Sequence, residues 1–169
     1  MKHFKTLLFA ALLFVGTTNL VTAQSKIAHI NTTELVQAMP EMKTAQAEIE
    51  KLTKTYETQI KEMATELQTK MKQYQAEVDT KTDEENLSRQ KEVQQMEQSI
   101  RQFQGQAQED LGKKEAALYK PVFEKAKTAI DKVAKAQGIQ YVLDSTQGGG
   151  VLVADGKDLM ADVKTELGF

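Results

Sequence analysis

Residues 49–78 read IEKLTKTYETQIKEMATELQTKMKQYQAEV, and this stretch decides the fold. Its large apolar residues recur at steps of three and four, which keeps them on one face of a helix. A polar segment at residues 79–85, DTKTDEE, interrupts the pattern, and Thr82 with Glu85 forms a candidate capping box for a second helix. The stretch therefore predicts a long helix, a turn and a second helix that begins at the turn.

Apolar and small residues return at helical spacing between Leu87 and Leu118. In an antiparallel helix pair, facing residues have a constant sum of residue numbers. Six pairs share the sum 163: Leu67 with Met96, Met63 with Ile100, Ile60 with Phe103, Tyr56 with Ala107, Leu52 with Leu111, and Ala45 with Leu118. The sequence therefore predicts an antiparallel helical hairpin over residues 41–120, the arm, about 58 Å long at about 1.5 Å per residue. Its predicted seam consists of Leu52, Tyr56, Ile60, Met63, Leu67, Met71, Val93, Met96, Ile100, Phe103 and Leu111.

The first residues have the pattern of a secretory signal peptide. Lys2 and Lys5 precede an apolar run at residues 7–15, and Val21 and Ala23 are suitable residues for a cleavage site after Ala23. The alternative to a cleaved signal peptide is an uncleaved membrane anchor. A helix that crosses a bilayer needs about 20 apolar residues, and this run is much shorter. We therefore expect residues 1–23 to be removed on export. Because the chain has no cysteine, the exported protein must be stable without disulfides.

The mature chain is acidic. Without residues 1–23 it has 20 basic and 24 acidic residues, and residues 41–110 alone have 10 basic and 15 acidic. This balance argues against nucleic-acid binding, which depends on neutralising phosphates with Lys and Arg. The length suits one domain, but the arm is too thin to enclose a globular core, so the compact part of the protein must be small.

Residues 24–40 and 121–169 are predicted to form a small β-rich body at the base of the arm. A strand, KIAHIN, is expected near its start, followed by a short helix that Asn31 caps. Pro40 suits the first turn of a new helix, and the fold-back places it level with the second proline, Pro121. We therefore predict that the two prolines mark the root of the arm.

The C-terminal part predicts a helix that ends near Ala136 and then two more elements. Two short apolar runs, residues 139–144 and 150–155, flank a glycine-rich turn, which is typical of a β-hairpin. Residues 158–167 predict a short amphipathic helix. Because such short strands leave exposed edges and an uncovered apolar face, we predict that copies of the chain associate. The residues expected at this association surface are Ile27, Ile30, Tyr141, Leu143, Val151 and Val153.

The sequence offers no catalytic or ligand-binding motif. His29 stands alone in a strand, and residues 148–150, GGG, precede a strand rather than the helix that a phosphate site requires. We therefore predict no catalytic residue, cofactor or metal, and no enzyme activity. Gly105 and Gly112 lie inside the returning helix, where they are either tolerated in an exposed position or serve as points at which the arm bends.

Several motifs occur in a characteristic order: KIAHIN, then MPE at residues 39–41, the charged hairpin, YKPVF at residues 119–123, and YVLD at residues 141–144. Together they resemble the Skp/OmpH family of periplasmic chaperones, over essentially the whole mature chain. The resemblance implies an α+β, mostly α, homotrimer whose strands form a small β-barrel from which three arms extend. It also implies ATP-independent holding of unfolded outer-membrane proteins between the arms, in the periplasm.

One departure limits the resemblance. Well-known members of the family have basic arms, whereas this arm is acidic, so binding of lipopolysaccharide or anionic lipid is not carried over to this chain. The alternative function is a structural coiled-coil spacer or adaptor protein of the cell envelope. A spacer tolerates stiffening of the arm, whereas a cage that holds clients does not.

Overall fold

A computed structural model describes residues 26–169, so the predicted signal peptide lies outside the described residues. The described part is mostly helical, with one small sheet. In chain order its elements are β1 (Ile27–Ile30), α2 (Thr32–Ala38), α3 (Pro40–Glu77), η1 (Val78–Thr80), α4 (Asp83–Ala136), β2 (Tyr141–Asp144), β3 (Lys157–Asp158) and α5 (Met160–Leu167).

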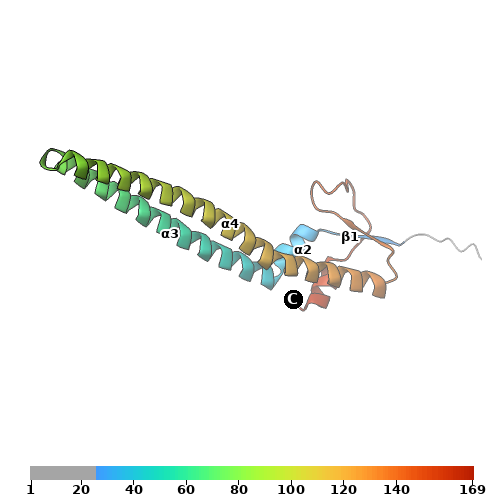
Figure 1. The fold of residues 1–169 in the computed structure, drawn as a ribbon. Coiled ribbons are helices and arrows are strands. Elements are labelled where there is room, and N and C mark those ends of the chain that lie inside the picture. Colours follow the sequence, from blue (N-terminus) through green and yellow to red (C-terminus); the bar gives the residue numbers. More distant parts are fainter. Residues whose placement is uncertain (1–25) are drawn as a thin grey trace, which may run out of the picture.

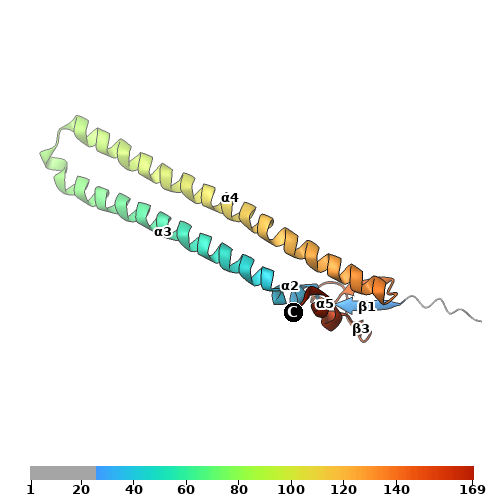
Figure 2. The same ribbon diagram turned by 90° about the horizontal axis from the view of Figure 1, so that it is seen from below.

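The two long helices, α3 and α4, form the arm (Figures 1 and 2). They lie side by side, and the turn at η1 reverses the chain between them. The capping box is confirmed: the Glu85 amide donates to Thr82 Oγ1 at 3.2 Å, and the Thr82 amide donates to Glu85 Oε2 at 2.9 Å. These bonds satisfy amides at the start of α4 that have no partner within the helix. The turn is thus fixed by residues adjacent in sequence.

Pro40 and Pro121 have different roles in the two helices. Pro40 is the first residue of α3, where its missing N–H removes no helical hydrogen bond. Pro121 lies inside α4, which continues through it to Ala136 as predicted. The chain then leaves the helix at Gly138, whose φ of 64° is a left-handed conformation that glycine adopts readily.

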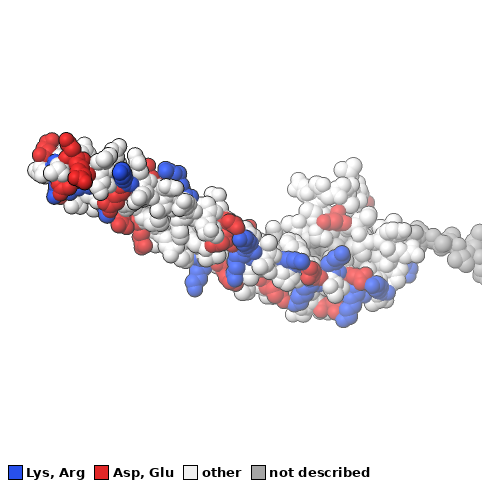
Figure 3. Space-filling view, in the orientation of Figure 1, with Lys and Arg blue, Asp and Glu red and all other residues white. Residues whose placement is uncertain are grey.

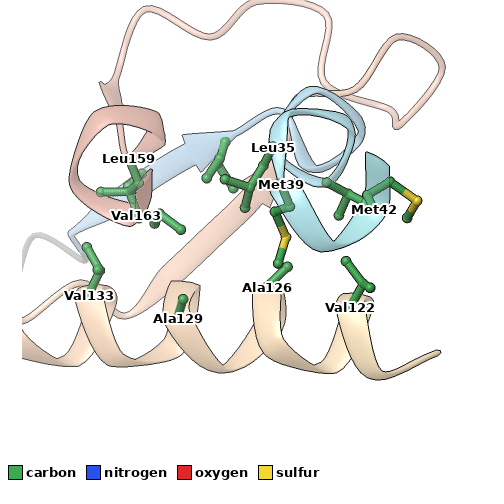
Figure 4. Close-up of a cluster of buried hydrophobic side chains, with 12 residues drawn as sticks. Leu35, Met39, Met42, Val122, Ala126, Ala129, Val133, Leu159 and Val163 are labelled. Carbon is green, nitrogen blue, oxygen red and sulfur yellow. The ribbon is translucent and has the colours of Figure 1, made fainter. Parts of the chain in front are cut away.

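The base has a compact apolar core on one face of α4 (Figure 4). Small side chains of α4, such as Ala126 and Ala129, let α2 and α5 approach closely, and Leu35, Leu159 and Val163 are fully buried between these elements. Complete burial of a leucine or valine side chain contributes about 1.5–3 kcal/mol. The core therefore joins the beginning, the middle and the end of the chain.

The predicted β-hairpin is wrong. β2 and β3 pair with the two edges of β1, both in parallel, and the strand order is β2-β1-β3. Residues 151–153 form no strand. The reason is that α4 extends beyond the root and returns the chain to the start of β1, so that β2 runs in the same direction as β1. A parallel neighbour needs a long connection, and residues 145–156 make one across to the other edge of β1.

The last helix, α5, is two residues shorter at its start than predicted, because Lys157–Asp158 form β3 instead. Asp158 then helps α5 to begin, since its Oδ1 accepts a hydrogen bond from the Met160 amide at 2.8 Å. Gly168, with φ of 87°, ends the helix as predicted.

Candidate functional site

The seam of the arm is closed at the root and open near the turn. At the root, Ile49 has 8% of its surface exposed, whereas Met71 and Val78 near the turn have 47% and 46% exposed. The apolar stripe is therefore buried beside the base, half-buried along most of the arm, and exposed at Met71 and Val78 near the turn. Toward the tip of the arm, apolar side chains remain accessible to another molecule.

The predicted seam residues follow this gradient. Met71 is exposed, and the others are half-buried: Leu52, Tyr56, Ile60, Met63, Leu67, Val93, Met96, Ile100, Phe103 and Leu111. Tyr56 and Phe103 pack edge to face with ring centroids 5.8 Å apart, and the Tyr56 hydroxyl donates to Asp110 Oδ2 at 3.3 Å. Partial rather than complete burial along the whole seam means that the arm is held by many modest contacts.

Polar side chains tie the two helices together near the turn. Lys70 and Tyr74 of α3 both contact Glu92 of α4, and the Tyr74 hydroxyl donates to Glu92 Oε2 at 2.6 Å. The Arg89 guanidinium lies 4.6 Å from the centroid of the Tyr74 ring and donates to Glu77 Oε2 at 2.5 Å. Hydrogen bonds from Lys70 and Tyr74 lower the pKa of Glu92, so its carboxylate is ionised near neutral pH. We call the group of Lys70, Tyr74, Glu77, Arg89 and Glu92 the bracket.

The bracket separates two grooves between α3 and α4. One groove, of about 710 Å³, has Tyr74 and Arg89 in its lining, and we call it the tip groove. The other, of about 360 Å³, has Lys70 and Glu92 in its lining and extends toward the middle of the arm. Polar cross-helix contacts thus replace close apolar packing here, and they leave open space on both sides.

A third groove, of about 530 Å³, lies at the root and is lined by both Pro40 and Pro121. The structure therefore brings the two predicted root residues together. Glu41 forms an ion pair with Lys125 beside this groove, and the hydrogen bond from Lys125 lowers the pKa of Glu41. Because these groups are exposed to solvent, their contribution to stability is small.

The two glycines of α4 have open surroundings. A Cβ atom added to Gly105 or Gly112 would meet nothing within 4 Å outside its own helix. Neither has a positive φ. Packing therefore does not require glycine at these positions, and their role as points of flexibility remains a prediction.

The sheet has an uncovered apolar face at the base. Ile27, Tyr141 and Leu143 are exposed on it, and Ile27 lies opposite Tyr141 in the β1–β2 register. Ile30 is instead buried in the core of the same chain, so it is not available at an exposed association surface. His29 is also on this strand, and its Nε2 lies 3.2 Å from the Gly156 carbonyl oxygen.

The long connection from β2 to β3 carries the most exposed apolar side chain in the described part of the protein. Leu152 has 98% of its surface exposed, its neighbour Val153 is also exposed, and Val151 is half-buried. The sequence pattern identified Val151 and Val153 as part of a strand but did not single out Leu152. In a strand, side chains alternate between the two faces, so Leu152 would have lain on the face opposite to Val151 and Val153. Residues 151–153 lie in a loop, where side chains do not alternate in this way.

Asp144 anchors the start of this connection. Its carboxylate accepts hydrogen bonds from Thr32 Oγ1 at 2.7 Å, from Thr146 Oγ1 at 2.7 Å and from the Thr146 amide at 2.9 Å. Partial burial acts to raise the pKa of Asp144, but the hydrogen bonds from Thr32 and Thr146 outweigh it and lower the pKa to about 2. The sequence pattern did not find this cluster, because Thr32 is distant in the chain from Asp144 and Thr146.

Residues 26–169 contain neither a candidate metal site nor a helix suited to cross a membrane. No group of three or more His, Cys, Asp or Glu side chains in this part of the chain is placed to hold a metal ion. None of the helices there has the length and the apolar character that crossing a membrane requires.

Comparison with known proteins then identifies the family. The model of the family described as outer membrane protein (OmpH-like) matches residues 26–167. The chain belongs to the OmpH-like family. Among solved structures, the fold is similar to that of a proposed outer membrane chaperone (OmpH-like) from Caulobacter crescentus CB15. The two share 16% sequence identity with a TM-score of 0.75, over 86% of this chain and 85% of the other. No curated protein matches the sequence.

Proposed function

We propose that this OmpH-like protein is an ATP-independent holdase chaperone of the periplasm that binds unfolded outer-membrane proteins between its arms and prevents their aggregation. The observation that carries the proposal is the partly open seam of the arm, which leaves apolar side chains accessible along an otherwise polar rod. The family to which the chain belongs and the chaperone with the same fold support it.

The physical properties of the arm suit this role. Unfolded barrel proteins expose alternating apolar side chains, which aggregate when they meet each other. An arm with half-buried apolar groups and a polar surface offers such chains many weak contacts instead of one specific pocket. If several arms surround the same client, each contact can remain weak, because binding to one arm raises the effective concentration at the next.

Assembly of the arms requires association through the base, and we propose a homotrimer. The support is the uncovered apolar face of Ile27, Tyr141 and Leu143, which nothing in residues 26–169 of the same chain covers. Leu143→Asp places a charge on this face and should lower the native mass toward that of a monomer. Leu87→Asp is the matched control, because Leu87 is equally apolar and exposed but lies in the arm. A monomeric native mass of the unchanged protein at micromolar concentration would exclude the trimer.

The function is tested by diluting a denatured outer-membrane barrel protein into buffer without ATP and following light scattering. The intact protein should suppress the scattering. A variant that lacks residues 59–75 together with residues 89–104 keeps the base and the turn but has a shortened arm, and it should lose the activity. Equal suppression by both proteins would place the activity outside the arm. Suppression by neither would favour the spacer hypothesis.

A further inference from the structure

We propose that the tip groove is a binding site for a short extended segment of unfolded polypeptide that carries apolar side chains on one face and a basic residue toward the turn. The inference rests on the proposed function, which it deepens by naming the residues that contact the client and the chemistry that they select.

The dimensions of the groove fit such a segment. It is lined by α3 and η1 within residues 68–78 and by α4 within residues 86–97. Eleven or twelve helical residues extend about 17 Å, and an extended polypeptide covers this distance in about five residues.

The apolar part of the groove is adaptable. Met71 and Val78 are accessible to solvent, and Val93 contributes from the opposite helix. Methionine is flexible and polarizable, and it is common on protein surfaces that bind many different apolar partners. These residues can therefore contact apolar side chains of several shapes, as a chaperone for varied clients requires.

Side-chain amides border the groove on both helices. Gln68 and Gln75 come from α3, and Gln90 and Gln94 come from α4; all four are exposed. Each amide offers both donors and an acceptor, and an extended polypeptide presents N–H and C=O groups that need partners. Hydrogen bonds from glutamines to a main chain do not depend on the client's sequence. The border therefore suits an unfolded polypeptide better than a small molecule of fixed shape.

The lining of the groove itself contains Lys72, Arg89 and Glu97, so the acidic charge that selects the basic end of the segment lies beyond the lining, near the turn. Glu77 is paired with Arg89 and Glu85 with Lys81, but Asp79, Asp83 and Glu84 take part in no ion pair within residues 26–169. Acidic side chains gather at this end of the arm in Figure 3. A client segment with Lys or Arg toward the turn is therefore attracted, most strongly at low salt, where the Debye length is about 30 Å at 0.01 M against about 8 Å at 0.15 M.

The groove exists before a client binds. The bracket formed by Lys70, Tyr74, Glu92, Arg89 and Glu77 connects the helices and lies at the side of the groove. Because these contacts fix the spacing of the helices without a client, binding does not have to open the arm. A site that is already formed loses less free energy to ordering when it binds.

The test is fluorescence anisotropy with the full mature chain and a labelled peptide in which Val and Thr alternate and two lysines follow at one end. Met71→Glu and Val78→Glu place a charge among the apolar groups and should each weaken binding about tenfold or more. Leu87→Glu is the control, because Leu87 is 52% exposed near the turn but does not line the groove. Its affinity for the peptide should equal that of the unchanged protein.

A second peptide, with two glutamates in place of the lysines, tests the selection by charge. The unchanged protein should prefer the lysine peptide at low salt, and the combined change Asp79→Asn, Asp83→Asn and Glu84→Gln should remove this preference. A preference that survives the triple change would show that these carboxylates do not select the client.

The outcomes separate this inference from the proposed function. If Met71→Glu, Val78→Glu and Leu87→Glu all bind the peptide as the unchanged protein does, the tip groove is not the site, while suppression of aggregation by the same proteins would leave the chaperone function standing. If the unchanged protein neither binds the peptide nor suppresses aggregation, both the site and the function are wrong.

Discussion

The gradient of burial along the seam predicts that equal truncations cost less stability near the turn than near the root. Ile49→Ala and Met71→Ala remove side chains of similar size from the same helix, at 8% and 47% exposure. Truncation of a buried Ile, Leu or Met to Ala costs about 2–5 kcal/mol, part of which comes from the cavity that remains. Ile49 is buried on all sides, so we expect a cost of about 3 kcal/mol, less a few tenths for the better helix propensity of Ala.

The change Met71→Ala should lower the free energy of unfolding much less. Only about half of its side chain is covered, which corresponds to about 1 kcal/mol of the roughly 1.5–3 kcal/mol for a completely buried Met. Its surroundings open into the tip groove, so truncation creates no closed cavity. The expected free energy of unfolding therefore falls about two to three times as much for Ile49→Ala as for Met71→Ala.

The measurement is urea unfolding followed by circular dichroism at 222 nm, at one protein concentration because association affects apparent stability. The slope of the transition should remain the same for both variants, so that the midpoints can be compared. A cost for Met71→Ala equal to that for Ile49→Ala would show that the seam near the turn is covered in solution, and the reasoning from exposure would fail.

Two further predictions concern local hydrogen bonds. Thr82→Ala should cost about 1 kcal/mol through the lost cap and should speed amide exchange around the turn, whereas Thr69→Ala, whose hydroxyl bonds only within its own helix, should not. Because the pKa of Asp144 is lowered to about 2 from 3.8, its contribution to the stability of the folded protein is present above about pH 4 and is lost as the pH falls toward 2. Asp144→Asn should therefore destabilise the protein more at pH 6 than at pH 2.5, as urea midpoints at the two values would show; an equal effect at both would contradict the ionised anchor.

The arm could be predicted from the sequence because its determinants are local and repeated. Apolar spacing defines a helix within a few turns, and the capping box at Thr82 and Glu85 requires only residues three apart. The register of the two helices then follows from the position of the turn. Cross-helix ion pairs lie close to it: Lys70 with Glu92 and Glu48 with Lys114 are each within one residue of the predicted sum.

The tip groove could not be predicted in the same way. The sequence pattern assigned Met71 and Val93 to the seam as if they were covered there, but their exposure depends on how far apart the helices lie. That separation depends on the contacts of Tyr74, Glu92 and Arg89, which lie on different helices. The sequence did contain one signal of the groove: Tyr74 occupies a seam position, and the charged residues Glu92 and Arg89 face it from the other helix. This signal can be interpreted only after the register of the two helices is known.

The sequence by itself therefore determined the helices, the turn and the two prolines at the root, because each depends on neighbouring residues or on a simple periodicity. Only the tertiary structure decided the topology of the sheet. Residues 139–144 and 150–155 have the local pattern of a hairpin, but strand pairing depends on where the chain has been brought. The extension of α4 past the root places β2 at one edge of β1, and the connection over residues 145–156 places β3 at the other. β2 and β3 therefore pair with β1 and not with each other. The length of α4 brings the chain back to the start of β1, so β2 runs parallel to β1.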